Sequence, residues 1–383
     1  MQTALLQPPS VTRTPKSARL PQIDYWRGLC LILIYVHHLP LSFGGNFTIS
    51  MLGFCDAVIV FVFLSGFVCR LAFGSALEKQ GWGGMIRKAL RRAGTLMLAH
   101  LAMTAFAVVA IVLYHKIWPG EMMLPDIRDG SEEAILAAPL REIGLAAIFK
   151  QHAWLCHVLP LYTIFILSVP LLFALERVSP WLLLAISGAL WAAVRLTITF
   201  SIGGFLHETG FWLNPFAWQF AFVGGFVLSS WVKQGRMGSL RPAFFYAGVG
   251  MLLFIAATKL ELYPRAAWFF PIWSTKGMCD FSYVAYFALL ALVLSPLVSD
   301  PKRLARWPAV SIISIIGQKS LTIWVGTEFV VYTVFFLRRA VAGDVWVDDL
   351  AIGAFAVAAL WLLIRREMLL RNQKVKLRSA VVG

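Results

Sequence analysis

About ten stretches of roughly 20 mostly apolar residues follow one another along this chain of 383 residues. A helix needs about 20 such residues to cross the roughly 30 Å hydrocarbon core of a bilayer. A spanning helix also satisfies its own backbone hydrogen bonds. The segments are 25–43, 51–73, 93–114, 155–175, 180–200, 214–232, 243–261, 281–298, 317–337 and 347–364. The sequence therefore predicts an all-α, polytopic membrane protein with about ten transmembrane helices.

Composition excludes an ordinary soluble protein. Hydrophobic residues make up 59% of the chain and charged residues 14%, whereas soluble domains carry about 25% charged residues. The net charge of +15 does not indicate nucleic acid, because the basic residues fall in short loops between apolar segments. We expect the lipid bilayer as a partner and no nucleic acid.

The loops alternate in charge. Lys and Arg gather in the N-terminal tail, in 79–92 and in 365–378, whereas the acids gather in the loops of the opposite side, six of them in 115–154. The positive-inside rule then places both termini in the cytoplasm. The predicted division is a disordered tail over 1–23, a membrane domain over 24–365 and a basic cytoplasmic tail over 366–383.

Two segments are predicted to lie at the membrane surface. "SEEAILAAP", from Ser131 to Pro139, has a Ser cap and two Glu in its first turn, which indicates a short helix. The apolar stretch 307–316 is the second.

The five cysteines are an odd number and most lie in or beside apolar segments, so a disulfide framework is not expected. We also expect no metal site, because His152, Cys156 and His157 lack a metal-type spacing.

Charged and histidine side chains within apolar segments are functional candidates, because ionisable groups in hydrocarbon are costly. The first segment, "DYWRGLCLILIYVHHLP", carries Asp24, Arg27, His37 and His38. Eleven residues separate Arg27 from His38, which gives a net rotation of about 20° and a separation of about 16 Å. Asp24, Arg27 and His38 therefore form one polar stripe, and His37 lies at its edge.

Asp56 of the second segment lies at about the depth of His38, and the two are expected to meet as a carboxylate–imidazole pair. Arg70 lies below Asp56 on a similar face. More modest interpretations remain open: His37 as a hydrogen-bonded bridge between helices, and Asp24 with Arg27 as an ion pair at a helix end.

An Arg followed eleven residues later by a His on the first span resembles the membrane acyltransferase-3 superfamily. The blocks "IDYWRGL", "GFCDAVIVFVFLSGF", "HVLPLYTIFILSVP", "NPFAWQFAFVGG" and "IGQKSLTIW" resemble, in order, those of the OpgC family. That family comprises inner-membrane enzymes that succinylate osmoregulated periplasmic glucans. The resemblance covers roughly 19–335.

The resemblance implies transfer of a succinyl group from cytoplasmic succinyl-CoA to a periplasmic glucan across the bacterial inner membrane, with no bound cofactor. His38 then acts as general base and Asp56 orients it. Phosphates of the donor would meet the predicted cytoplasmic loop that contains Arg87, Lys88, Arg91 and Arg92. Arg70 and Lys319 are further donor-binding candidates.

Residues for the acyl group or the acceptor are assigned on the same basis. Arg195 is placed to pair with a succinyl carboxylate or to snorkel to the interface, and Glu328 is expected to face the interior. Similarity to the family's blocks adds Asn214, Trp218, Gln219 and Lys276.

Two other functions remain open. One is an acyltransferase-3 type O-acetylase of another surface glycan. Two departures from the family pattern favour keeping it: Ile59 stands where an acidic residue is expected, and no Arg follows Lys276 in "GMCDFSYVAYF". The other is a proton-coupled transporter, against which the lack of internal repeats argues.

Overall fold

The computed structural model describes residues 21–41, 55–123, 131–150, 153, 155–199, 211–236, 242–259, 276–298, 308–341 and 345–382. Every regular element in these ranges is a helix, so the all-α prediction is confirmed. The helices are α1 (Pro21–His38), α3 (Ala57–Ile117), α4 (Ser131–Ala137), α5 (Pro139–Ala147), α6 (Val158–Val178), α7 (Pro180–Thr199), α8 (Pro215–Lys233), α9 (Pro242–Lys259), α10 (Phe281–Val298), α12 (Pro308–Gln318), α13 (Ser320–Val341) and α14 (Val345–Val382).

The apolar segments predicted from the sequence coincide with these helices. Among the described residues, six helices are long and apolar enough to span a membrane: α3, α6, α7, α8, α13 and α14. Shorter apolar helices, including Phe245–Ala256 and Phe281–Val293, accompany them. The chain is therefore a polytopic helical membrane protein.

The two arms of α3 correspond to the predicted second and third spans. They meet at Gly81, whose φ of 66° and ψ of −170° are not helical. The chain reverses there. A contact between the two arms shows this, in which Nζ of Lys88 donates to the carbonyl oxygen of Ala72 at 2.6 Å, 16 residues earlier. A left-handed φ favours glycine, and this hairpin brings the basic residues of 87–92 back over the first arm.

Close backbone contact joins α1 to α12. A Cβ added at Gly28 would lie 1.9 Å from the carbonyl oxygen of Ile313, and one added at Gly317 would lie 1.8 Å from that of Asp24. Small residues allow helices to approach this closely in membranes. The segment predicted to lie at the interface, 307–316, thus forms most of a helix that packs directly against α1.

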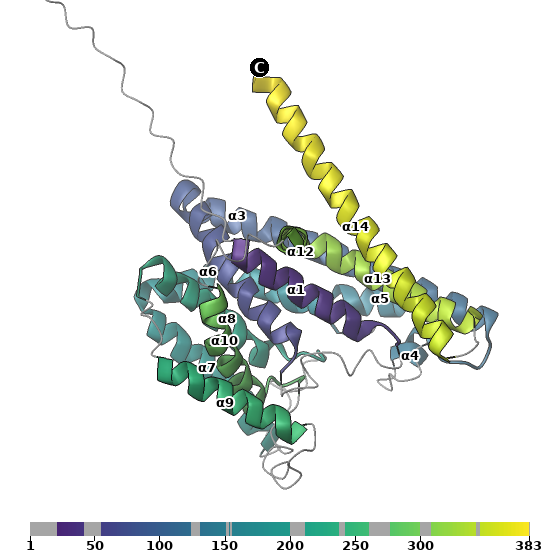
Figure 1. Cartoon of the computed structure of the whole chain (residues 1–383), viewed down its shortest axis with the longest axis horizontal. Coiled ribbons are helices and arrows are strands. Elements are labelled where there is room, and N and C mark those ends of the chain that lie inside the picture. Colours follow the sequence, from purple (N-terminus) through teal and green to yellow (C-terminus); the bar gives the residue numbers. More distant parts are fainter. Residues whose placement is uncertain are drawn as a thin grey trace, which may run out of the picture.

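The C-terminal helix differs from its predicted end. The tenth span was expected to finish at 364, yet α14 continues to Val382 and extends past the other helices (Figure 1). No Gly or Pro lies between 364 and 382, and Arg, Leu, Lys and Glu are good helix formers, so nothing stops the helix there. The predicted N-terminal tail lies largely outside the described residues, as does the loop around Asp126.

Candidate functional site

His38 and Glu328 form the centre of the candidate site. Nδ1 of His38, at the end of α1, lies 3.1 Å from Oε1 of Glu328 on α13. The glutamate side chain is 2% exposed and the histidine 15%. One turn before Glu328, the indole of Trp324 meets the imidazole edge to face, with 6.2 Å between ring centroids. The histidine ring is therefore held by a carboxylate and an aromatic ring of the same helix.

Arg27 contacts the first residue of the same helix, α13. Its Nη2 donates to Oγ of Ser320 at 2.8 Å, and its guanidinium lies over the ring of Phe61, 5.4 Å from the centroid. Arg27 and His38 thus both meet α13, as their predicted common helical face requires. Asp24 is buried where α1 packs against α12, and His37 is exposed.

The structure pairs His38 with Glu328, whereas the sequence predicted a pair with Asp56. Its Oδ1 caps α3 by accepting from the backbone N–H of Val58 at 2.9 Å, and it also accepts from the hydroxyl of Tyr283. Its Oδ2 lies 2.5 Å from Nζ of Lys276. Equal depth in neighbouring spans is therefore not enough to pair two side chains, because the carboxylate is already committed to three other donors.

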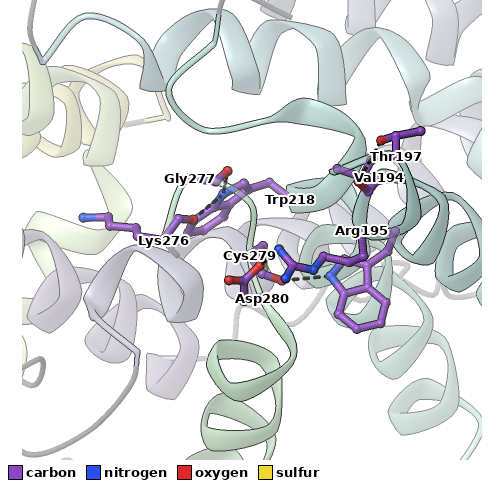
Figure 2. Close-up of polar contacts among 9 residues, drawn as sticks. Val194, Arg195, Thr197, Trp218, Lys276, Gly277, Cys279 and Asp280 are labelled. Carbon is purple, nitrogen blue, oxygen red and sulfur yellow. Dashed lines mark hydrogen bonds and ion pairs between the residues drawn. The ribbon is translucent and has the colours of Figure 1, made fainter. Parts of the chain in front are cut away.

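The family-like block at the start of α8 holds the segment that carries Lys276. The backbone N–H of Asn214 donates to the carbonyl of Gly277 at 2.9 Å, and the buried Trp218 indole donates to the carbonyls of Lys276 and Gly277 at 3.1 Å each. Figure 2 shows the indole against this backbone and the Lys276 side chain pointing away from it. Asn214 and Trp218 thus position Lys276, and neither belongs to the lining of the two cavities described below.

The side chain of Asn214 also caps α8, because its Oδ1 accepts from the N–H groups of Phe216 and Ala217. An Asn followed by Pro before an apolar run is a helix-start pattern. That pattern was the sequence signal for a structural role.

Two more predicted acyl- or acceptor-binding residues make structural contacts. Arg195 forms an ion pair with the buried Asp280, at the end of the same segment (Figure 2). Gln219 exchanges hydrogen bonds with Ser187 on α7, at 2.6 Å through its oxygen and 2.8 Å through its nitrogen. Gln219 thus joins α8 to α7, and Arg195 joins α7 to the 276–280 segment, which neither assignment anticipated.

A cationic cavity of about 520 Å³ lies between α3, α6 and α13 on the Arg27 side of the site. Four basic side chains line it, namely Arg27, Lys88, Arg91 and Arg92. The rest of the lining is apolar or polar without charge, and it includes Cys69 and Tyr162. Positive charge beside an apolar wall suits a ligand with both phosphates and an alkyl arm.

Three predicted donor-binding residues lie elsewhere. Arg87 is exposed and is not among the residues that line the cationic cavity. Arg70 donates to Glu176 at 2.6 Å, and Lys319 lies 3.0 Å from Glu367 of α14. On a helix, side chains at successive positions diverge by about 100°, which separates Arg87 from Lys88.

A second cavity of about 160 Å³ adjoins the first. Its lining includes His37, His38, His157, Lys276 and Trp212. Val158 and Trp324 belong to the walls of both cavities. His38 therefore lies beside the partition between a cationic cavity and a smaller cavity rich in histidine.

The sequence prediction missed Trp324 and His157. Trp324 precedes Glu328 by four residues, a spacing that places both on one helical face, so the Glu328 assignment contained the signal. His157 was considered only as a metal ligand. The described residues contain no group of three or more His, Cys, Asp or Glu arranged to hold a metal ion, and all five cysteines are free thiols.

Comparison with known proteins gives one family. The family model described as OpgC protein matches residues 19–369 of this chain. No curated protein and no solved structure matches the chain.

Proposed function

This chain belongs to the OpgC protein family, and we propose that it is a membrane O-acyltransferase that moves a succinyl group from succinyl-CoA to hydroxyl groups of a periplasmic glucan. The bacterial inner membrane is the corresponding location. The observation that carries the proposal is the His38–Glu328 pair, which lies beside the partition between a cationic cavity and a second cavity.

The imidazole is the proposed general base. An ionised Glu328 only accepts hydrogen bonds, so the proton of His38 lies on Nδ1 and the lone pair on Nε2. Nε2 takes the proton of the acceptor hydroxyl as its oxygen attacks the thioester carbonyl carbon. The carbon–sulfur bond then breaks, and His38 returns the proton to the departing CoA thiolate. The products are the glucan ester and CoA, and no other reactant is needed.

The cationic cavity is the proposed donor site. Phosphate groups bind Arg and Lys through charge-assisted hydrogen bonds, and Lys88, Arg91 and Arg92 contribute three such side chains to the wall. The alkyl arm of the donor would pass Arg27 and Phe61 towards Trp324. This path leads the thioester towards His38.

Lys276 favours succinyl over acetyl as the acyl group. It lines the histidine-containing cavity with a side chain 33% exposed. An ammonium group has three N–H donors, so contact with Asp56 leaves capacity for a second carboxylate. An acetyl group offers no such charge.

The direct test uses the purified chain, a linear or cyclic glucan, and either succinyl-CoA or acetyl-CoA without any ion gradient. Mass spectrometry of the glucan then identifies the group that is added. Succinylation supports the proposal, and acetylation alone would make the chain an O-acetylase. No transfer from either donor, together with gradient-dependent uptake into vesicles, would indicate a transporter.

Occupancy of the donor site has an independent readout. Cys69 lines the cationic cavity, and it is the one thiol of the five that is not buried. Succinyl-CoA should therefore slow alkylation of Cys69 by a maleimide, and Cys69→Ser should remove the label. A rate of alkylation unchanged at saturating donor would place the donor elsewhere.

A further inference from the structure

Trp324 separates the two cavities. It lies in the wall of both, together with the much smaller Val158, and its side chain is 4% exposed. On one side its ring stacks on Phe61, at 6.4 Å between centroids and 21° between planes. On the other side it meets His38 edge to face. Any acyl group that passes from the cationic cavity to His38 has to pass this indole.

The indole N–H of Trp324 is also a buried donor without an acceptor among the described residues. Its Nε1 is buried and has no hydrogen-bond partner among the described residues, unlike Nε1 of Trp191 and Trp218. A buried donor left without an acceptor destabilises the conformation that contains it. A second position of the ring, in which an oxygen of an arriving ligand accepts a hydrogen bond from this N–H, would therefore be favoured over the closed position.

We propose that Trp324 is a gate between the donor cavity and the histidine-containing cavity, and that its N–H binds the carbonyl oxygen of the acyl group as the group passes. In the absence of donor the ring closes the connection, which keeps water and acceptor from the donor cavity. When the thioester arrives, a rotation of the ring opens the connection and satisfies the N–H. The carbonyl oxygen gains negative charge during attack, so this contact strengthens in the transition state.

This inference rests on the proposed acyl transfer, but one of its tests does not need activity. An impermeant, negatively charged thiosulfonate is added to one side of oriented membrane vesicles, and reaction of Cys69 is measured. In the unchanged protein we expect reaction from the side on which the cationic cavity opens and none from the other. In Trp324→Ala, Cys69 should react at comparable rates from both sides. Labelling of Trp324→Ala that stays one-sided overturns the gate.

Kinetics test the role of the N–H. Trp324→Phe keeps a ring in the partition but removes the donor, so labelling should stay one-sided. Its kcat for transfer should fall about 10- to 100-fold, the effect of losing a hydrogen bond to a developing charge. KM for the acyl-CoA should change less than kcat, because the contact is stronger in the transition state than in the bound thioester. An unchanged kcat overturns the binding role of the N–H.

Hydrolysis gives the third measurement. Trp324→Ala should increase hydrolysis of succinyl-CoA in the absence of glucan while transfer falls, because water then reaches the thioester. Trp361, an exposed residue of α14, offers matched controls, and Trp361→Ala and Trp361→Phe should behave as the unchanged protein. If Trp324→Ala does not fold, the kinetics of Trp324→Phe still decide the binding role of the N–H, and labelling of Cys69 from both sides in the unchanged protein would still overturn the gate. An unchanged protein that neither transfers nor hydrolyses would count against the proposed function and not against the gate, which the labelling tests separately.

Discussion

His38 and Glu328 are separated by 290 positions in the chain, yet their side chains lie 3.1 Å apart. The contact joins the end of α1 to the middle of α13, and the same two helices meet again through Arg27 and Ser320. The two helices therefore fix the imidazole and the guanidinium relative to each other along one interface.

Substitution of His38 should have the largest effect on catalysis. His38→Ala removes the proposed base, and a general base typically contributes about 10²- to 10⁴-fold in rate. Glu328→Gln keeps the shape of the side chain but removes the charge that holds Nδ1–H, so its kcat should lie between those of His38→Ala and the unchanged protein. Steady-state kinetics with succinyl-CoA and glucan measure both.

His37→Ala is the matched control for the base, because His37 is the exposed neighbour on α1. It should affect kcat less than His38→Ala does. Abolished transfer in His37→Ala together with a tolerated His38→Ala would move the catalytic role to His37 and contradict the Glu328 contact as its basis.

Neutralising the cationic cavity should weaken donor binding. Arg91→Gln with Arg92→Gln should raise KM for succinyl-CoA and reduce the protection of Cys69 by that donor, because two phosphate-binding side chains are lost. Arg87→Gln makes the same kind of charge change on the same helix but outside the cavity, so it should alter neither quantity. An equal rise in KM for Arg87→Gln would mean that the effect is only one of loop charge.

The Lys276–Asp56 pair should contribute to stability. Asp56→Asn leaves the ammonium without its counter-charge, and because Lys276 is 33% exposed we expect a loss of about 1–2 kcal/mol, less than for a fully buried pair. Asp56→Ala should lose about 1 kcal/mol more, since it also removes the cap of α3. Thermal unfolding in detergent measures both losses.

Removing the ammonium as well gives the control. Asp56→Asn combined with Lys276→Met should be more stable than Asp56→Asn alone, because the unpaired charge is gone. If the double variant is no more stable than the single one, the loss in Asp56→Asn does not come from Lys276.

The contact between α1 and α12 should not tolerate a methyl group. Gly28→Ala and Gly317→Ala each push a Cβ into a backbone carbonyl of the other helix, and we expect each to cost about 1–3 kcal/mol or more. Gly94→Ala is the matched control: a Cβ at this α3 position meets nothing within 4 Å, and alanine there favours the helix. Yields of folded protein and unfolding temperatures distinguish the three variants.

The helices could be predicted from the sequence because a bilayer demands long apolar segments, and each such segment satisfies its own backbone. The common face of Arg27 and His38 could be predicted for a similar reason, since it depends on the geometry of one helix. The side chain that pairs with His38 could not be predicted in this way. Glu328 reaches His38 from another helix, and no sequence pattern near either residue predicts how α13 packs against α1.

The basic loop shows the same limit at smaller scale. Its charge predicted the side of the membrane, but only the hairpin at Gly81 decides which basic side chains face the cavity. Lys88, Arg91 and Arg92 do, whereas Arg87 does not. Within 276–280 the sequence departs from the family pattern, since no Arg follows Lys276. The contacts that hold this segment come from residues far away in the chain, so they could not be predicted.

Three side chains and one backbone N–H from 191–219 hold the short 276–280 segment. The side chains are Trp191 at the carbonyl of Cys279, Arg195 at Asp280 and Trp218 at the carbonyls of 276–277, and the backbone N–H is that of Asn214 at Gly277. We therefore expect that the two stretches have to be exchanged together to keep these contacts. A chimera that takes 191–219 from a relative with another acceptor, but keeps the resident 276–280, should lose activity without changing specificity. In a random mutagenesis screen, substitutions at these four positions would resemble substrate-binding defects although none of them lines either cavity.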